Sequence, residues 1–198
     1  MRLKLGPHTL PGETGDTAAW CGLNPTVVKL CYRFDALPYI PPGILVVGRA
    51  DENFIGTHPV GIGDPVAMGA EFAQGFSSLI RGYPRIDVWE ASNEFTPANP
   101  EEMTWYATML EEFARQMQIM GKRALIGSFA TGNPRPELWP YYVPALRACK
   151  YYGAIHARHC YGPIDRWNAL RYRDDAVEFA KLGFPHVLVN LSRCGVVI

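Results

Sequence analysis

The chain has 198 residues, of which 48% are hydrophobic and 12% aromatic, enough apolar sequence for the core of one folded domain spanning residues 1–198. Its 19 lysines and arginines balance 19 aspartates and glutamates, and no basic stripe is present, so the charge pattern excludes nucleic acid as an expected partner and fits a neutral sugar. No stretch reaches the roughly 18 apolar residues of a membrane span, and the N-terminus lacks the apolar part of a signal peptide, so we expect no membrane partner and a cytoplasmic location.

Short runs rich in β-branched and aliphatic residues recur along the chain, each bounded by turn residues. Buried runs of this kind, separated by helical patterns, are typical of parallel strands joined by helical crossovers. From the fourth run onward the starts lie roughly thirty residues apart, the length of a βα unit. The predicted strands cover residues 3–6, 26–31, 44–48, 86–90, 124–128, 153–156 and 186–190.

Helices are predicted between most of these strands. An Asp-Pro pair opens a predicted helix over 64–82, and an Asn-Pro pair opens another over 99–121, because Asp and Asn cap helix N-termini and Pro is favoured at the first helical position. Two further helices are expected over 137–152, interrupted by its prolines, and over 166–182. The segment 32–43 holds too many prolines for a full helix, so that unit is predicted to be abbreviated.

This alternation predicts an α/β protein, a shortened or incomplete TIM-type (β/α) barrel of about seven parallel strands. The sequence has no GxGxxG or GxxxxGK[ST] loop, which disfavours a nucleotide-binding sheet. A complete eight-unit barrel needs about 250 residues, so this chain must be trimmed or lack a piece.

Polar residues follow the predicted strands, at the end where barrel enzymes carry their active sites. Tryptophans can stack on sugar rings, although at such spacings they are more often core residues; Trp89 lies beside this predicted mouth and is the candidate for stacking. The other candidate site residues are His8, Arg49, Glu90, Asn93, Glu94, His159, Tyr161 and Arg193.

We predict no metal and no cofactor. The five cysteines are scattered and include no CxxC pair, which argues against a zinc ribbon and a disulfide framework. His156, His159 and Cys160 are the nearest approach to a ligand set, but three residues around one strand end rarely converge on one ion.

The fourth predicted strand and the residues after it, Ile86-Asp87-Val88-Trp89-Glu90-Ala91-Ser92-Asn93-Glu94, resemble the fourth-strand signature of clan A glycoside hydrolases. His159-Cys160-Tyr161-Gly162 is similar to the His-x-Tyr of that family. The resemblance implies that Glu94 is the general acid/base, kept protonated by apolar walls and a partner charge. It also implies that Asn93 binds the sugar 2-hydroxyl and that Tyr161 orients the nucleophile.

The seventh strand departs from the family pattern. Where the family has Thr-Glu-x-Gly, with Glu as nucleophile, this chain has Ser192-Arg193-Cys194-Gly195. Three interpretations of Arg193 stay open: a substrate clamp, a salt-bridge partner of Glu94, or an incidental residue of the tail. Glu90 is either a second catalytic carboxylate or a buried paired one. The chain also ends at Ile198 before an eighth strand, which predicts a truncated form or a barrel whose open edge is covered by another copy of the chain.

Three functions stay open. The leading one is a glycosidase-like hydrolase that uses Glu94. The second is a carboxylesterase-type hydrolase with Ser92, Ser128 or Ser192 as nucleophile, His156 or His159 as base and Glu94 as the acid of the triad, although no G-x-S-x-G elbow is present. The third is a catalytically degenerate barrel that binds a glycan.

Overall fold

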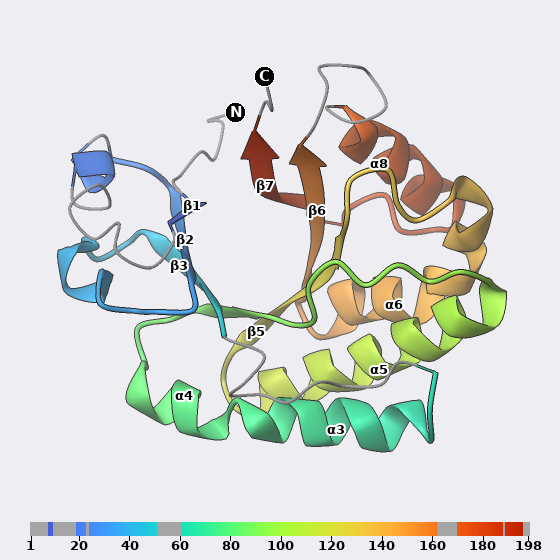
Figure 1. Cartoon of the computed structure of the whole chain (residues 1–198), viewed down its shortest axis with the longest axis horizontal. Helices are drawn as coiled ribbons and strands as arrows, with labels where there is room; N and C mark the ends of the chain where they lie inside the picture. Colours follow the sequence, from blue (N-terminus) through green and yellow to red (C-terminus); the bar gives the residue numbers. More distant parts are fainter. Residues whose placement is uncertain are drawn as a thin grey trace.

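The computed structural model describes residues 8–9, 19–22, 24–50, 61–161, 170–187 and 189–195; for 8–9, 161 and 189–195 it describes the backbone alone. Strands in these residues form one sheet in which neighbours follow chain order and every pair is parallel. The sheet is curled, and the long helices lie on the outside of the curl (Figure 1). The chain therefore has an α/β fold of the incomplete TIM-barrel type.

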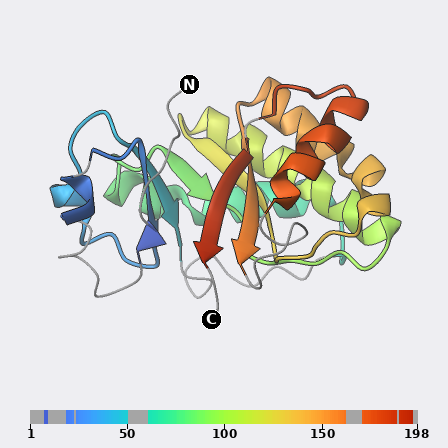
Figure 2. The ribbon, with the colours of Figure 1, turned by 90° about the horizontal axis from the view of Figure 1, so that it is seen from above.

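Five strands, β2 to β6, form a curled half-barrel, and their inward side chains fill its interior. The expected barrel of about seven strands is not formed as such: these five make the half-barrel, while β1, of only two residues, pairs beside β2 and β7 runs beside β6 (Figure 2). The bounds are β1 His8–Thr9, β2 Val27–Cys31, β3 Leu45–Arg49, β4 Val88–Glu90, β5 Arg123–Phe129, β6 Ile155–Tyr161 and β7 Val189–Gly195.

The last two strands end later than the sequence predicts. Strand β6 continues through Arg158 and His159, which lie beyond the predicted strand over 153–156. Arg158 is fully buried on the outer face, where its Nε lies 3.2 Å from Asp175 Oδ2 on α8 (Arg171–Lys181). This pairing compensates the buried charge, so the strand need not end there. The predicted strand over 3–6 lies outside the described residues.

The described helices agree with the predicted ones, with two breaks; of the predicted helix over 166–182, residues 166–169 lie outside the described residues and α8 covers Arg171–Lys181. The 64–82 helix is divided at Phe76 into α3 (Pro65–Gly75) and α4 (Ser77–Gly82), and the proline-containing 137–152 segment into a 3-10 helix η2 (Pro136–Tyr142) and α6 (Val143–Tyr151). The abbreviated unit contains the 3-10 turn η1 (Leu37–Tyr39). None of the described helices is long and apolar enough to cross a membrane.

The predicted start of α5 (Pro100–Ile119) is confirmed. Asn99 Oδ1 accepts a hydrogen bond from the Glu102 N–H at 2.9 Å, and Glu102 Oε2 accepts one from the Ala98 N–H at 2.8 Å. These bonds satisfy N–H groups that an α-helix leaves unpaired at its N-terminus. Gly69 lets α3 approach α5 closely, since a Cβ there would collide with the Met109 carbonyl oxygen.

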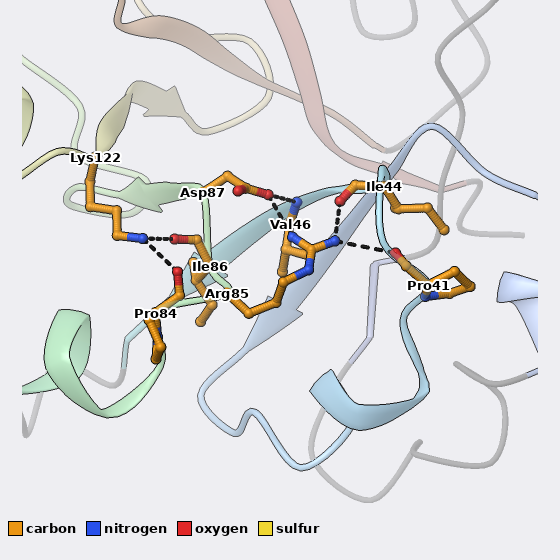
Figure 3. Close-up of polar contacts among 8 residues, drawn as sticks. All are labelled: Pro41, Ile44, Val46, Pro84, Arg85, Ile86, Asp87 and Lys122. Atoms are coloured by element: carbon orange, nitrogen blue, oxygen red, sulfur yellow. Dashed lines mark hydrogen bonds and ion pairs between the residues drawn. The ribbon is translucent and has the colours of Figure 1, made fainter.

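A polar network fixes the N-terminal ends of β3 and β4 (Figure 3). Asp87 Oδ2 accepts hydrogen bonds from the Val46 N–H at 2.8 Å and from Arg85 Nη1 at 2.9 Å, and Arg85 Nη2 also donates to the Ile44 carbonyl at 2.5 Å. Lys122 Nζ donates to the carbonyls of Pro84 and Ile86. This end of a barrel serves stability, which leaves the opposite, carboxyl end of the strands for function.

Candidate functional site

The inner face of the half-barrel changes from apolar to polar along each strand. One layer of inward side chains is apolar, and because side chains alternate along a strand, the residue two positions further on faces the same interior. Those next residues are charged or titratable on four strands, and all four are buried. The apolar layer is Val27, Leu45, Val47, Val88, Leu125, Ile155 and Ala157, and the polar residues beyond it are Lys29, Arg49, Glu90 and His159.

Glu90 is fully buried and pairs through both carboxylate oxygens. Lys29 Nζ lies 2.6 Å from Oε2, and the Ser128 hydroxyl donates to Oε1 at 2.5 Å. Burial by itself raises the pKa of Glu90, but the charges of Lys29 and Arg49 and the hydrogen bonds from Lys29 and Ser128 outweigh it and lower the pKa. Glu90 is therefore an ionised carboxylate at neutral pH, held by charge and hydrogen bonds.

Ser128 reaches the interior because β5 contains a bulge. Between Ile126 and Phe129 strand β5 has one residue more than β6, which reverses the alternation so that Ser128 faces inward while Phe129 packs in the outer core. Gly127 in this bulge has a φ of 95°, and Ser128 has a φ of 42°. Bulges recur next to functional sites, where they redirect a side chain.

Glu94 lies in the loop after β4 and contacts a histidine of β6. Its side chain is 29% exposed, and Oε1 is 2.8 Å from His159 Nδ1 in a hydrogen bond. Burial lowers the pKa of His159; the hydrogen bond to Glu94 and the charge of Glu90 act in the opposite direction, and Lys29 adds to the lowering. A carboxyl group held by a neutral histidine and open to solvent can exchange a proton with a bound molecule.

Two further predicted residues lie near these groups. Arg49 faces the interior, its guanidinium carbon 4.9 Å from the centre of the Tyr32 ring, and its charge contributes to lowering the pKa of Glu90. Asn93 Oδ1 is buried and has no hydrogen-bond partner among the described residues. A buried acceptor of this kind suits a donor supplied from outside, such as a water or a ligand hydroxyl.

The structure does not bring Trp89 to the site. Its side chain is fully buried on the outer face of β4, with ring centres 5.3 Å from Phe34 and 5.7 Å from Phe76. The strand alternation that turns Glu90 inward turns Trp89 outward, so its predicted stacking on a sugar is replaced by a core role. His8, Tyr161 and Arg193 lie in β1, β6 and β7, and their side chains are outside the description; the Arg193 backbone pairs with His159.

The described serines are not assembled for ester hydrolysis. The Ser128 hydroxyl donates to Glu90, and Ser92 Oγ is 2.7 Å from Tyr106 Oη. His156 faces outward, with its Nδ1 3.3 Å from Tyr142 Oη. Neither serine has a hydrogen bond to a histidine among the described contacts, and the Ser192 side chain is outside the description.

Lys29 and Ser128 complete the site, although Lys29 was not among the predicted site residues and Ser128 was considered only as an ester nucleophile. The signal for Lys29 is a single cation within the apolar run Val-Val-Lys-Leu-Cys, since a charge buried in a strand needs a partner. No sequence pattern predicts that Ser128 belongs to the site, because the bulge that turns it inward arises from the pairing register between β5 and β6. Within the described part of the chain, no group of three or more His, Cys, Asp or Glu is placed to hold a metal ion.

Comparison with known proteins concerns the fold. No family model matches the chain, and no curated protein matches it. A hyperthermostable endo-1,4-beta-D-mannanase from Thermotoga petrophila, solved with maltose and glycerol, superposes with a TM-score of 0.52 at 13% identity, over 89% of this chain and 72% of that one. A 3-keto-D-glucoside 4-epimerase from E. coli superposes with a TM-score of 0.42 at 8% identity, over 95% and 67%. The likeness to the mannanase supports the barrel-type fold, and at this identity it extends to the fold alone.

Proposed function

We propose that this protein is a glycosidase-like hydrolase that acts on a carbohydrate, with Glu94 as its general acid/base. The observation that carries the proposal is the position of Glu94, at the carboxyl end of β4, partly exposed and hydrogen-bonded to His159. Barrel enzymes carry out their chemistry at this end of the strands. The resemblance of the Asn93-Glu94 pair to the clan A signature and the barrel-type fold support the same assignment.

Glu94 suits proton transfer better than Glu90 does. Glu90 is fully buried, and both of its oxygens are engaged by Lys29 and Ser128. A group that protonates a leaving oxygen must come within hydrogen-bond distance of it, which requires access from the interior or the mouth. Glu94 has that access and Glu90 does not, so Glu90 contributes charge and support.

The proposed reaction uses one carboxyl group for both proton transfers. Strand β7 carries no carboxylate in Val189–Gly195, so the route does not pass through a glycosyl-enzyme bond on that strand. Protonated Glu94 donates its proton to the glycosidic oxygen as the bond from that oxygen to the anomeric carbon breaks. Water then adds to the anomeric carbon, and its surplus proton returns to Glu94.

The test compares leaving groups. In Glu94→Gln, hydrolysis of alkyl glycosides and disaccharides should fall about 10²- to 10⁴-fold, the usual contribution of general acid catalysis. Hydrolysis of dinitrophenyl glycosides should fall far less, because that leaving group needs no proton. Glu137→Gln is the matched control, since Glu137 is exposed and pairs with exposed Arg135. Equal rates for wild type and Glu94→Gln on alkyl glycosides would refute the assignment.

A second candidate is glycan binding without turnover, which the lack of a carboxylate in β7 favours. It predicts saturable binding of a glycan with no release of product on prolonged incubation. Calorimetric titration with oligosaccharides, combined with product analysis, separates the two functions. In this case Glu94→Gln should weaken binding at most modestly, because an amide also forms hydrogen bonds to sugar hydroxyls.

A further inference from the structure

Glu94 and the residue that accepts its backbone hydrogen bond, Ser128, have backbone conformations that are uncommon for residues other than glycine. Glu94 has a φ of 57° and Ser128 a φ of 42°, both in the left-handed region that side chains disfavour. Such conformations persist only where the surroundings hold them, and they cluster at functional sites. The two are joined directly, because the Glu94 N–H donates to the Ser128 carbonyl oxygen at 2.9 Å.

The Ser128 side chain forms a second hydrogen bond, to Glu90, in addition to the bond that its backbone carbonyl accepts from Glu94. Its hydroxyl donates to Glu90 Oε1 at 2.5 Å, and Glu90 Oε2 is held by Lys29 on β2 at 2.6 Å. Ser128 and Glu90 are both fully buried. The same residue therefore offers its hydroxyl to a fixed carboxylate and its carbonyl to the backbone of Glu94.

We propose that Glu90 and Ser128 are positioning residues, which act through the β5 bulge to hold the Glu94 backbone where its carboxyl group meets His159. The tether runs from Lys29 to Glu90, from Glu90 to the Ser128 hydroxyl, and from the Ser128 carbonyl to the Glu94 N–H. Without the Ser128 hydroxyl, the bulge has one bond fewer holding a disfavoured backbone conformation. The loop after β4 then relaxes, and the carboxyl group leaves its fixed place beside the histidine.

The inference deepens the proposed function, because it gives the proposed acid/base its support, but its first test needs no substrate. His159 is followed by long-range ¹H–¹⁵N NMR in wild type and in Ser128→Ala. In wild type, the contact with Glu94 should hold His159 in one tautomer. In Ser128→Ala the ring nitrogens should shift toward a mixture of tautomers, and the pKa of His159 should fall, because the hydrogen bond to Glu94 raises it.

Two more variants separate the loss of the Ser128 hydroxyl from the effects of backbone strain and of the Lys29 and Glu90 charges. Ser128→Gly accepts a positive φ freely but lacks the hydroxyl, so it should behave like Ser128→Ala. In Lys29→Met/Glu90→Gln both charges of the ion pair are removed, but the Gln amide oxygen can still accept a hydrogen bond from Ser128, so His159 should keep its wild-type tautomer. Ser77→Ala is the control, since Ser77 lies on α4 and, among the described residues, its hydroxyl bonds only to the sulfur of Met120, at the end of α5, at 3.9 Å.

An unchanged tautomer and titration of His159 in both Ser128→Ala and Ser128→Gly would overturn the inference, whatever the protein hydrolyses. If a glycoside substrate is found, Ser128→Ala should lower kcat at least about 10-fold with KM changed less than about 2-fold, because misplacing an acid slows the chemical step. A rise in KM with kcat unchanged would assign Ser128 to substrate binding and would also overturn the inference. Failure of the proposed function would instead appear as a lack of turnover with the His159 effects intact.

Discussion

Lys29 and Glu90 form a buried ion pair, and removing the charge of Glu90 should lower the free energy of unfolding more than removing the charge of Lys29. The Nζ–Oε2 distance is 2.6 Å, and the side chains are 6% and 0% exposed. Removing one partner of such a pair costs about 3–5 kcal/mol, because a buried charge is left behind. Glu90→Gln leaves two buried cations, Lys29 and Arg49, without this carboxylate, so its cost should be about 4–5 kcal/mol. Lys29→Met leaves Glu90 with the charge of Arg49 and the Ser128 hydroxyl, so its cost should lie at or below about 3 kcal/mol.

The double variant Lys29→Met/Glu90→Gln should recover most of the loss, because it removes both charges of the pair, keeps the hydrogen bond to Ser128 and leaves Arg49 as one buried cation there instead of two. We expect it within about 1–2 kcal/mol of wild type, which gives a coupling energy of at least about 2 kcal/mol. Urea unfolding followed by circular dichroism at pH 7 measures each free energy of unfolding. The exposed pair Lys181–Glu178 is the control, and its disruption should cost less than about 1 kcal/mol. Additive costs in the double variant, or a larger loss for Lys29→Met than for Glu90→Gln, would refute the reasoning.

Two further predictions concern the outer core. Burial first, and then the charge of Arg158, lower the pKa of His156 from 6.5 to about 3. The unfolded chain therefore takes up this proton below about pH 6.5 and the folded chain does not, so stability is lost as the pH falls, by about 3 kcal/mol at pH 4. Between pH 7 and pH 4 the free energy of unfolding measured in urea should fall less in His156→Gln than in wild type. Parallel pH dependences of the two proteins would contradict the prediction. Trp89→Ala should cost about 3–5 kcal/mol of stability and leave the affinity for glycans unchanged. A folded Trp89→Ala variant that binds glycans about 10-fold more weakly would show that Trp89 contributes to binding and would contradict its core role.

Much of the fold is determined locally by the sequence. The Asn-Pro and Asp-Pro pairs mark the starts of α5 and α3, because capping depends on residues within one helical turn. Short apolar runs locate the strands, because burial on both faces requires continuous hydrophobic residues. The strand ends at β6 and β7 are not local properties. Arg158 extends β6 because Asp175, on a different element, compensates its charge.

For the site, the sequence by itself determined that polar residues follow apolar strands, and its fourth-strand motif drew attention to Glu94. Only the tertiary structure decided which neighbour faces the interior: Glu90 turns inward and Trp89 outward, because the curl of the sheet gives its two faces different surroundings. The partners of Glu90, Lys29 on β2 and Ser128 on β5, come from distant parts of the chain. Their pairing depends on strand register and on one extra residue in β5, and neither can be read from residues that are neighbours in sequence.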